Sequence, residues 1–71
     1  MLVDLMMAVY VRASGELVQV WSPDQQLTSM ENCKRTAELM LKIPLVPERT
    51  ALAICSDPTT GEIWTKWYVA P

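Results

Sequence analysis

The stretch that decides the fold is Thr50–Val69, TALAICSDPTTGEIWTKWYV. It holds two runs rich in β-forming residues, Thr50–Ser56 and Glu62–Val69. Between them, Asp57 favours the start of a turn, Pro58 fixes the backbone angle φ, and Gly61 supplies a left-handed residue. The sequence therefore predicts an antiparallel hairpin with the four-residue loop Pro58–Gly61.

Side chains alternate between the two faces of a strand, so this loop also predicts which residues share a face. One face carries Leu52, Ile54, Ile63, Thr65, Trp67 and Val69. The other face carries Ala51, Ala53, Cys55, Trp64, Lys66 and Tyr68. The first set holds most of the large apolar side chains, and we expect it to face the core.

A second hairpin is predicted near the start of the chain, between Leu2–Arg12 and Glu16–Ser22. A two-residue loop, Ser14-Gly15, gathers the apolar residues of both strands on one face. That face carries Leu5, Met7, Val9, Val11, Val18 and Val20. A loop one residue longer would scatter the valines over both faces, so the valine pattern favours the shorter loop.

The segment Leu27–Lys42 has the periodicity of an amphipathic helix. Thr28 followed by Glu31 matches a capping box, and Ser29 is an alternative N-cap. Pro44 ends the predicted helix because it disfavours the helical conformation of the preceding residue. One arc is apolar or small: Met30, Cys33, Thr36, Ala37, Met40 and Leu41. The polar side offers two i,i+4 ion pairs, Glu31–Arg35 and Glu38–Lys42.

The predicted order β-β-α-β-β defines an α+β fold, a four-stranded antiparallel sheet with one helix packed on one face. With 71 residues the chain has room for one domain, residues 1–71. The first and third strands are apolar on both faces, which predicts the strand order second, first, third, fourth. The helix-covered face is expected to hold Leu5, Met7, Val9, Val11, Val18, Val20, Leu52, Ile54, Ile63, Trp67 and Val69.

This arrangement predicts an uncovered face rich in aromatic residues. It carries Tyr10, Trp21, Trp64 and Tyr68, with Arg12, Lys66, Met6, Ala8, Ala51 and Ala53. Large exposed apolar patches on small proteins usually mark interaction sites. We expect the face to contact a second copy of the chain or a different macromolecule. The alternative is that the aromatic residues only pack around the sheet.

Composition excludes several functions. The chain has 6 Lys+Arg against 8 Asp+Glu, a net charge of -2, and no histidine. Duplex DNA and anionic membranes need a concentrated basic surface. Without histidine, and without paired carboxylates or a phosphate-binding motif, we expect no enzyme, metal, cofactor or small-molecule substrate. Single-stranded nucleic acid could stack on the aromatic face, but Arg12 and Lys66 are the only cations predicted there.

The two cysteines leave two interpretations open. Cys33 lies on the apolar arc of the predicted helix, whereas Cys55 points to the opposite face in the register above, which favours free thiols. If the second hairpin is shifted by one position, Cys55 turns towards the helix with Ala51 and Ala53, and a disulfide forms easily. A disulfide would indicate a secreted or periplasmic domain, whereas free thiols fit the cytoplasm.

The layout of the chain resembles small uncharacterised proteins carried by phages and prophages. The resemblance rests on a short hairpin, a helix opening TSMENC, and the stretch ALAICSDPTTGE. It implies a non-catalytic binding protein, an inhibitor of host machinery in the cytoplasm of a bacterial host, with a host protein as partner. It supplies no shared site motif, so no functional residue is transferred from it.

Overall fold

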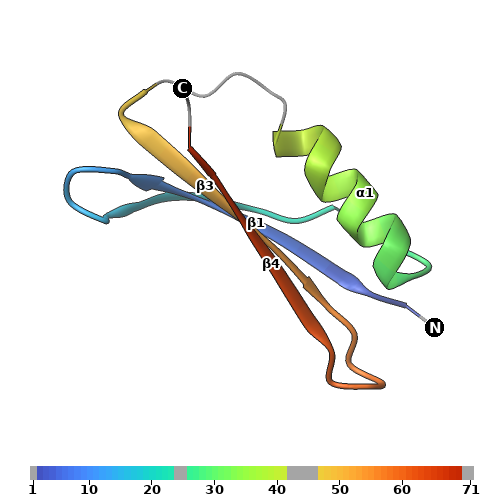
Figure 1. The fold of residues 1–71 in the computed structure, drawn as a ribbon. Helices are drawn as coiled ribbons and strands as arrows, with labels where there is room; N and C mark the ends of the chain where they lie inside the picture. The colour runs from blue at the N-terminus through green and yellow to red at the C-terminus, as the bar shows by residue number, and fades with distance from the viewer. Residues whose placement is uncertain (1, 24–25, 42–46, 70–71) are drawn as a thin grey trace.

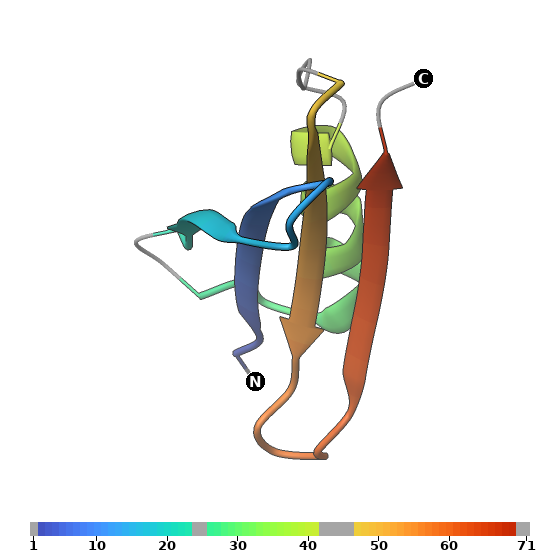
Figure 2. The same ribbon diagram turned by 90° about the vertical axis from the view of Figure 1, so that its left-hand side faces the viewer.

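The computed structural model describes residues 2–23, 26–41 and 47–69. Within these ranges the elements follow the predicted order, shown in Figure 1: β1 (Asp4–Val11), β2 (Leu17–Trp21), α1 (Met30–Leu41), β3 (Arg49–Ser56) and β4 (Ile63–Val69). The strands form one antiparallel sheet in the order β2-β1-β3-β4, and α1 lies across one side of it (Figure 2). The predicted α+β class and strand order are confirmed.

The hairpin of β3 and β4 has the predicted register. Ser56 lies opposite Ile63, and Cys55 lies opposite Trp64. In the loop, the Asp57 carboxylate accepts a hydrogen bond of 2.9 Å from the backbone N–H of Thr59. Gly61 has a φ of 78°, the left-handed conformation that the sequence predicted. Local turn chemistry therefore fixes this hairpin.

The register predicted for the hairpin of β1 and β2 is wrong. The loop spans four residues, and it closes where the N–H of Val11 donates to the carbonyl of Glu16 over 2.8 Å. A β-bulge between Val9 and Tyr10 then shifts the pairing again, so that Val9 lies opposite Gln19 and not Val20. The longer loop and the bulge divide the valines between the two faces, which the simple alternation of the sequence does not reveal.

The two hairpins meet through β1 and β3, and here the predicted core face is reversed. Leu5 lies opposite Cys55, and Met7 lies opposite Ala53. The small residues of β3 thus face α1 together with the apolar residues of β1. Consequently, the following residues predicted for the covered side lie on the opposite side: Leu52, Ile54, Ile63, Trp67 and Val69. Val20 is also on that side, because the changed β1–β2 register places it opposite Ala8.

The helix is confirmed, with narrower bounds than predicted. Its N-cap is the alternative, Ser29, whose hydroxyl accepts a hydrogen bond of 3.1 Å from the backbone N–H of Asn32. Thr28 instead accepts a bond of 2.9 Å from the Asn32 side chain. The helix ends at Leu41, while Lys42 and Pro44 lie outside the described residues.

The core between α1 and the sheet is built largely from small side chains. The helix contributes Cys33, Ala37 and Leu41 from the predicted arc, spaced one turn apart. The buried cluster consists of Val3, Leu5, Met7, Cys33, Ala37, Leu41, Ala51, Ala53 and Cys55. Small residues on both sides let the helix lie close to β3, and that close approach selects the face that α1 covers.

We expect Ala53→Leu to lower the free energy of unfolding by about 1–3 kcal/mol, because Ala53 is fully buried and a larger side chain overpacks the contact with α1. Denaturant unfolding followed by circular dichroism measures the change. Thr65→Leu on the opposite face is the control, with an expected change within about 0.5 kcal/mol. Equal stability of the two variants would mean that the helix covers the other face.

Candidate functional site

The sheet side opposite α1, called the open face below, carries most of the exposed large apolar side chains. It faces the viewer in Figure 2. Its apolar residues are Met6, Ala8 and Tyr10 from β1, Leu17 and Val20 from β2, Leu52 and Ile54 from β3, and Ile63, Trp67 and Val69 from β4. Exposure is highest on the two edge strands, as at Ile63 (67%) and Trp67 (56%) on β4 and Val20 (51%) on β2.

An aromatic pair spans the open face near the end of β1 and the start of β3. The rings of Tyr10 and Trp67 have centroids 5.8 Å apart and are tilted by 45°. Because β3 lies between β1 and β4, the two rings meet across the central strand beside Leu52, which is half-buried. Tilted aromatic pairs at this separation attract each other, so the two rings support each other's position.

The central part of the open face is uncharged among the described strand residues. Asp4 stands at one end, where its carboxylate accepts a hydrogen bond of 2.6 Å from the Gln26 side chain. Arg12 stands just beyond the other end of β1 and donates to the carbonyl of Pro47 over 3.0 Å. Both charged groups therefore already have partners, and the surface between them is apolar with a few hydroxyl groups.

The predicted set of binding residues is only partly brought together. Tyr10 lies on the open face, and Arg12 lies at its margin. The other four residues belong to the helix-facing side: Trp21, Trp64, Lys66 and Tyr68. Trp64, Lys66 and Tyr68 are on the other face because the two hairpins join one position away from the expected phase, which turns β4 over. Trp21 is on the other face because the β1–β2 register differs from the predicted one, so that it lies opposite Met7 and not Ala8.

Three of the four misplaced residues contact the core or the helix, namely Trp64, Lys66 and Tyr68. Trp64 and Tyr68 are half-buried and pack against the core cluster. The Lys66 ammonium lies 3.7 Å from the Glu38 carboxylate of α1, so Glu38 pairs across to the sheet. Trp21 lies opposite Met7 near the outer edge of the sheet. These contacts hold β4 and the helix together.

Sequence reasoning placed Ile63, Trp67 and Val69 in the core, so it missed them as candidates for binding. The signal that could have found them is the spacing of small residues. Ala51, Ala53 and Cys55 repeat every second residue, and Cys33 and Ala37 repeat one helical turn apart. Matching small surfaces favour close packing of helix on strand.

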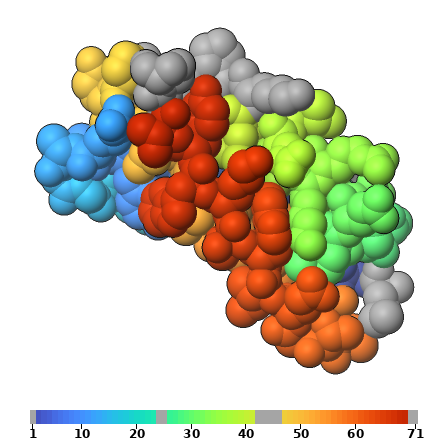
Figure 3. Space-filling model, in the orientation of Figure 1, coloured from blue at the N-terminus to red at the C-terminus, as the bar shows by residue number. Residues whose placement is uncertain are grey.

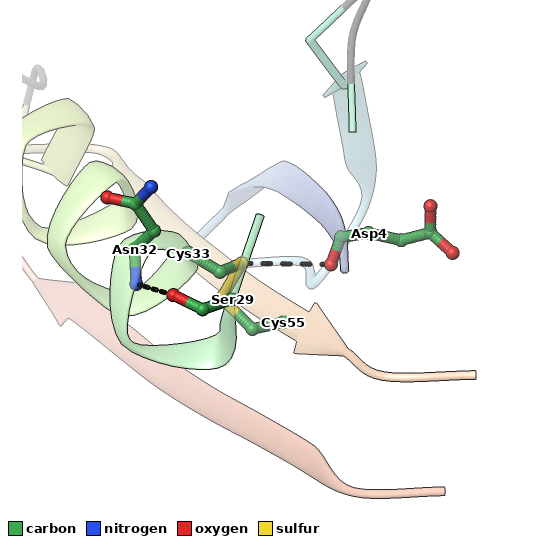
Figure 4. The surroundings of a disulfide bond; sticks show 5 residues. All are labelled: Asp4, Ser29, Asn32, Cys33 and Cys55. Atoms are coloured by element: carbon green, nitrogen blue, oxygen red, sulfur yellow. Dashed lines mark hydrogen bonds between the residues drawn. A yellow bond between two sulfur atoms is a disulfide. The ribbon is translucent and has the colours of Figure 1, made fainter. Parts of the chain in front are cut away.

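A disulfide joins Cys33, in the first turn of α1, to Cys55, near the end of β3 (Figure 4). Both cysteines are fully buried, and their Cα atoms are 6.0 Å apart. The Cys33 sulfur lies 3.7 Å from the carbonyl oxygen of Asp4; a disulfide sulfur carries no proton, so this is a packing contact. Of the two interpretations that the sequence left open, the structure has the bonded one.

Metal binding and membrane insertion were also considered for the described residues. Within residues 2–23, 26–41 and 47–69, no group of three or more histidine, cysteine, aspartate or glutamate side chains could hold a metal ion. Over the same ranges, no helix has the length and apolar character needed to cross a membrane. In comparisons with known proteins, no family model, curated protein or solved structure matches this chain.

We expect the double substitution Cys33→Ala and Cys55→Ala to lower the free energy of unfolding by about 3 kcal/mol. The disulfide closes a loop with a sequence separation of 22, and the lost constraint on the unfolded chain accounts for this magnitude. Denaturant unfolding of the oxidised, reduced and substituted proteins measures the effect. If the oxidised and reduced chains unfold at the same denaturant concentration, the bond contributes nothing to stability.

Proposed function

We propose that this protein is a non-catalytic protein–protein interaction domain that forms a homodimer by packing its open face against that of a second copy. The observation that carries the proposal is the group of exposed apolar side chains on β4 and β2, led by Ile63 and Trp67. Leaving such a group in water is unfavourable for a small protein, and covering it is favourable by roughly 25 cal/mol per Å².

Charge favours a second copy as the occupant. A two-fold dimer brings the same patch of both molecules together, so any central charge would meet its own sign. The centre of the open face carries no charged side chain among the described strand residues. An apolar face is therefore complementary to itself.

A dimer interface of ordinary size would use about a sixth of the molecular surface. Stable interfaces bury about 800 Å² of each partner, and the whole chain exposes 4808 Å². Two open faces packed together would form a sandwich with sheets about 10 Å apart and one helix outside each sheet. The Tyr10–Trp67 pair would be part of this interface. Aromatic residues with a polar group are common at the centre of interfaces.

The resemblance to small phage proteins adds a proposed partner class to this dimer. On that basis alone, the domain would inhibit host machinery by binding a host protein in the bacterial cytoplasm. Single-stranded nucleic acid is a weaker alternative, because Lys66 lies on the helix-facing side and Arg12 already binds the carbonyl of Pro47. Bases stacked on Tyr10 and Trp67 would therefore have Arg12, at the margin of the open face, as their one neighbouring cation on that face among the described residues.

We expect Val20→Glu to weaken dimerisation by roughly 30-fold or more, because a carboxylate would be buried without a partner. The side chain of Val20 is half exposed in the single chain, so the variant still folds. Analytical ultracentrifugation over a range of concentrations measures association, and circular dichroism confirms folding. Leu39→Glu is the matched control, because Leu39 is exposed on α1 and away from the open face.

A wild-type chain that stays monomeric at millimolar concentration would contradict the proposed dimer. So would a Val20→Glu variant that associates as strongly as the wild type. Loss of association in the Leu39→Glu control would place the contact on the helix instead.

A second candidate is a secreted or periplasmic domain stapled by a disulfide, and the Cys33–Cys55 bond favours it. Structural disulfides persist in oxidising compartments and are rare in the cytoplasm. Both cysteines are fully buried, as expected for a structural bond. This candidate concerns the compartment, and it is compatible with dimerisation through the open face.

Alkylation of thiols in freshly lysed cells distinguishes the two compartments. If the domain works in an oxidising compartment, we expect mass spectrometry of the denatured protein from its native source to show no alkylated cysteine. Two alkylated cysteines would exclude the secreted interpretation. Reduction before alkylation is the control, and it should label both Cys33 and Cys55.

A further inference from the structure

The outer edge of β4 presents regularly spaced backbone groups. The N–H of Asp57 donates to the carbonyl of Glu62 over 2.9 Å, so these residues form a hydrogen-bonded pair of the antiparallel ladder. Such pairs alternate along the ladder, so Trp64, Lys66 and Tyr68 direct their N–H and C=O groups to β3. The groups of the intervening residues point outwards: Ile63, Thr65, Trp67 and Val69.

The neighbouring ladder supports this assignment independently. The N–H of Arg12 donates to the carbonyl of Glu48 over 2.8 Å. By the same alternation, the even-numbered residues of β3 bond to β1, which leaves its odd-numbered residues for β4. Both ladders therefore give the same backbone orientation, and the outward groups of β4 lie among residues whose side chains belong to the open face.

The two edges of the sheet differ in protection. Edge strands are usually shortened, bulged or charged so that they do not pair with other chains. β2 has five residues and a bulge at its pairing with β1, whereas β4 has seven residues in regular pairing. Figure 3 looks onto β4, coloured red, which lies in front of the other described segments. Its one charge, Lys66, is paired with Glu38 across the helix side.

We propose that the outer edge of β4 pairs antiparallel with β4 of a second copy about a two-fold axis at Thr65. Full overlap of the two strands would set Lys66 against the same lysine of the second copy, and like charges opposite each other are unfavourable. A register centred on Thr65 places Lys66 opposite Trp64 of the second copy and pairs threonine with threonine. It also pairs Trp67 with Ile63, an aromatic with a β-branched residue.

This contact goes beyond the proposed dimer and does not depend on it. It uses the backbone of β4, whereas the proposed dimer uses side chains of the open face. Because an edge leaves both faces of the sheet free, two edge-paired copies would form a continuous sheet of eight strands. If both contacts form, two face-to-face dimers join into a tetramer.

Amide hydrogen exchange followed by NMR at low and high protein concentration tests the edge contact. We expect the amides of Ile63, Thr65, Trp67 and Val69 to exchange roughly tenfold more slowly at high concentration, because pairing protects them. The amides of Trp64, Lys66 and Tyr68 should be protected at both concentrations. The Val20→Glu variant should keep the same pattern, which separates the edge contact from the open-face contact.

A cysteine variant tests the register. Thr65→Cys should form a covalent dimer under mild oxidation, because residues on the two-fold axis lie about 5.5 Å apart between Cα atoms. Val69→Cys is the matched control: it lies on the same strand and face, but the two copies of residue 69 would be roughly 27 Å apart at 3.4 Å per residue. The buried Cys33–Cys55 bond leaves the introduced thiol as the reactive one.

Exchange of the outward amides at unprotected rates up to millimolar concentration, with the inward amides still protected, would overturn the edge contact. Equal cross-linking of the Thr65→Cys and Val69→Cys variants would overturn the register. Loss of outward protection in Val20→Glu would assign the protection to the open face and overturn the inference, even if the proposed dimer holds.

Discussion

The close approach of α1 to β3 determines the rest of this structure. The helix presents Cys33 and Ala37 where the strand presents Ala53 and Cys55, and these four residues are fully buried. Neither side has a side chain large enough to keep the backbones apart, and the disulfide ties the first turn of the helix to the end of the strand. A side chain the size of leucine at any of these positions would separate the two elements.

The position of the helix then determines which side chains meet solvent. Because side chains alternate along a strand, the residues before and after one that faces α1 lie on the opposite side of the sheet. Since β3 gives its small residues to the helix, Leu52 and Ile54 are left on the open face, and the pairing of β4 adds Ile63 and Trp67. The open face proposed for dimerisation is therefore apolar because the small residues of the same strands form the core.

Local signals predicted the parts of the fold that depend on local chemistry. The turn Asp57–Gly61 fixed its own hairpin, the Ser29 region began the helix, and the order of the strands followed from their apolar character. The phase between the two hairpins, that is, which face of the second hairpin continues the helix-facing side of the first, does not depend on local chemistry. It is set by the pairing of residues far apart in the sequence, such as Leu5 and Cys55. Within the second hairpin, the alternation of the small residues Ala51, Ala53 and Cys55 is the one pattern that indicates which face meets the helix.

The candidate site was predicted less well for the same reason. Sequence reasoning assumed that the more hydrophobic face of the second hairpin is the buried one. Here close packing of small side chains outweighed the larger transfer free energy of leucine and isoleucine, so Trp67 and Ile63 changed places with Trp64 and Tyr68. Tyr10 kept its predicted position because the β1 alternation does not depend on the second hairpin.

The central pairing of β1 with β3 also has a consequence for how the chain folds. Each hairpin can form from neighbouring residues, but the sheet is complete only when bonds such as Arg12 to Glu48 close the long segment that contains the helix. Closing that segment costs chain entropy before any contact repays it, so we expect the complete sheet to form more slowly than either hairpin alone. Until the hairpins pair, both central strands have an unpaired edge, and unpaired strand edges favour aggregation.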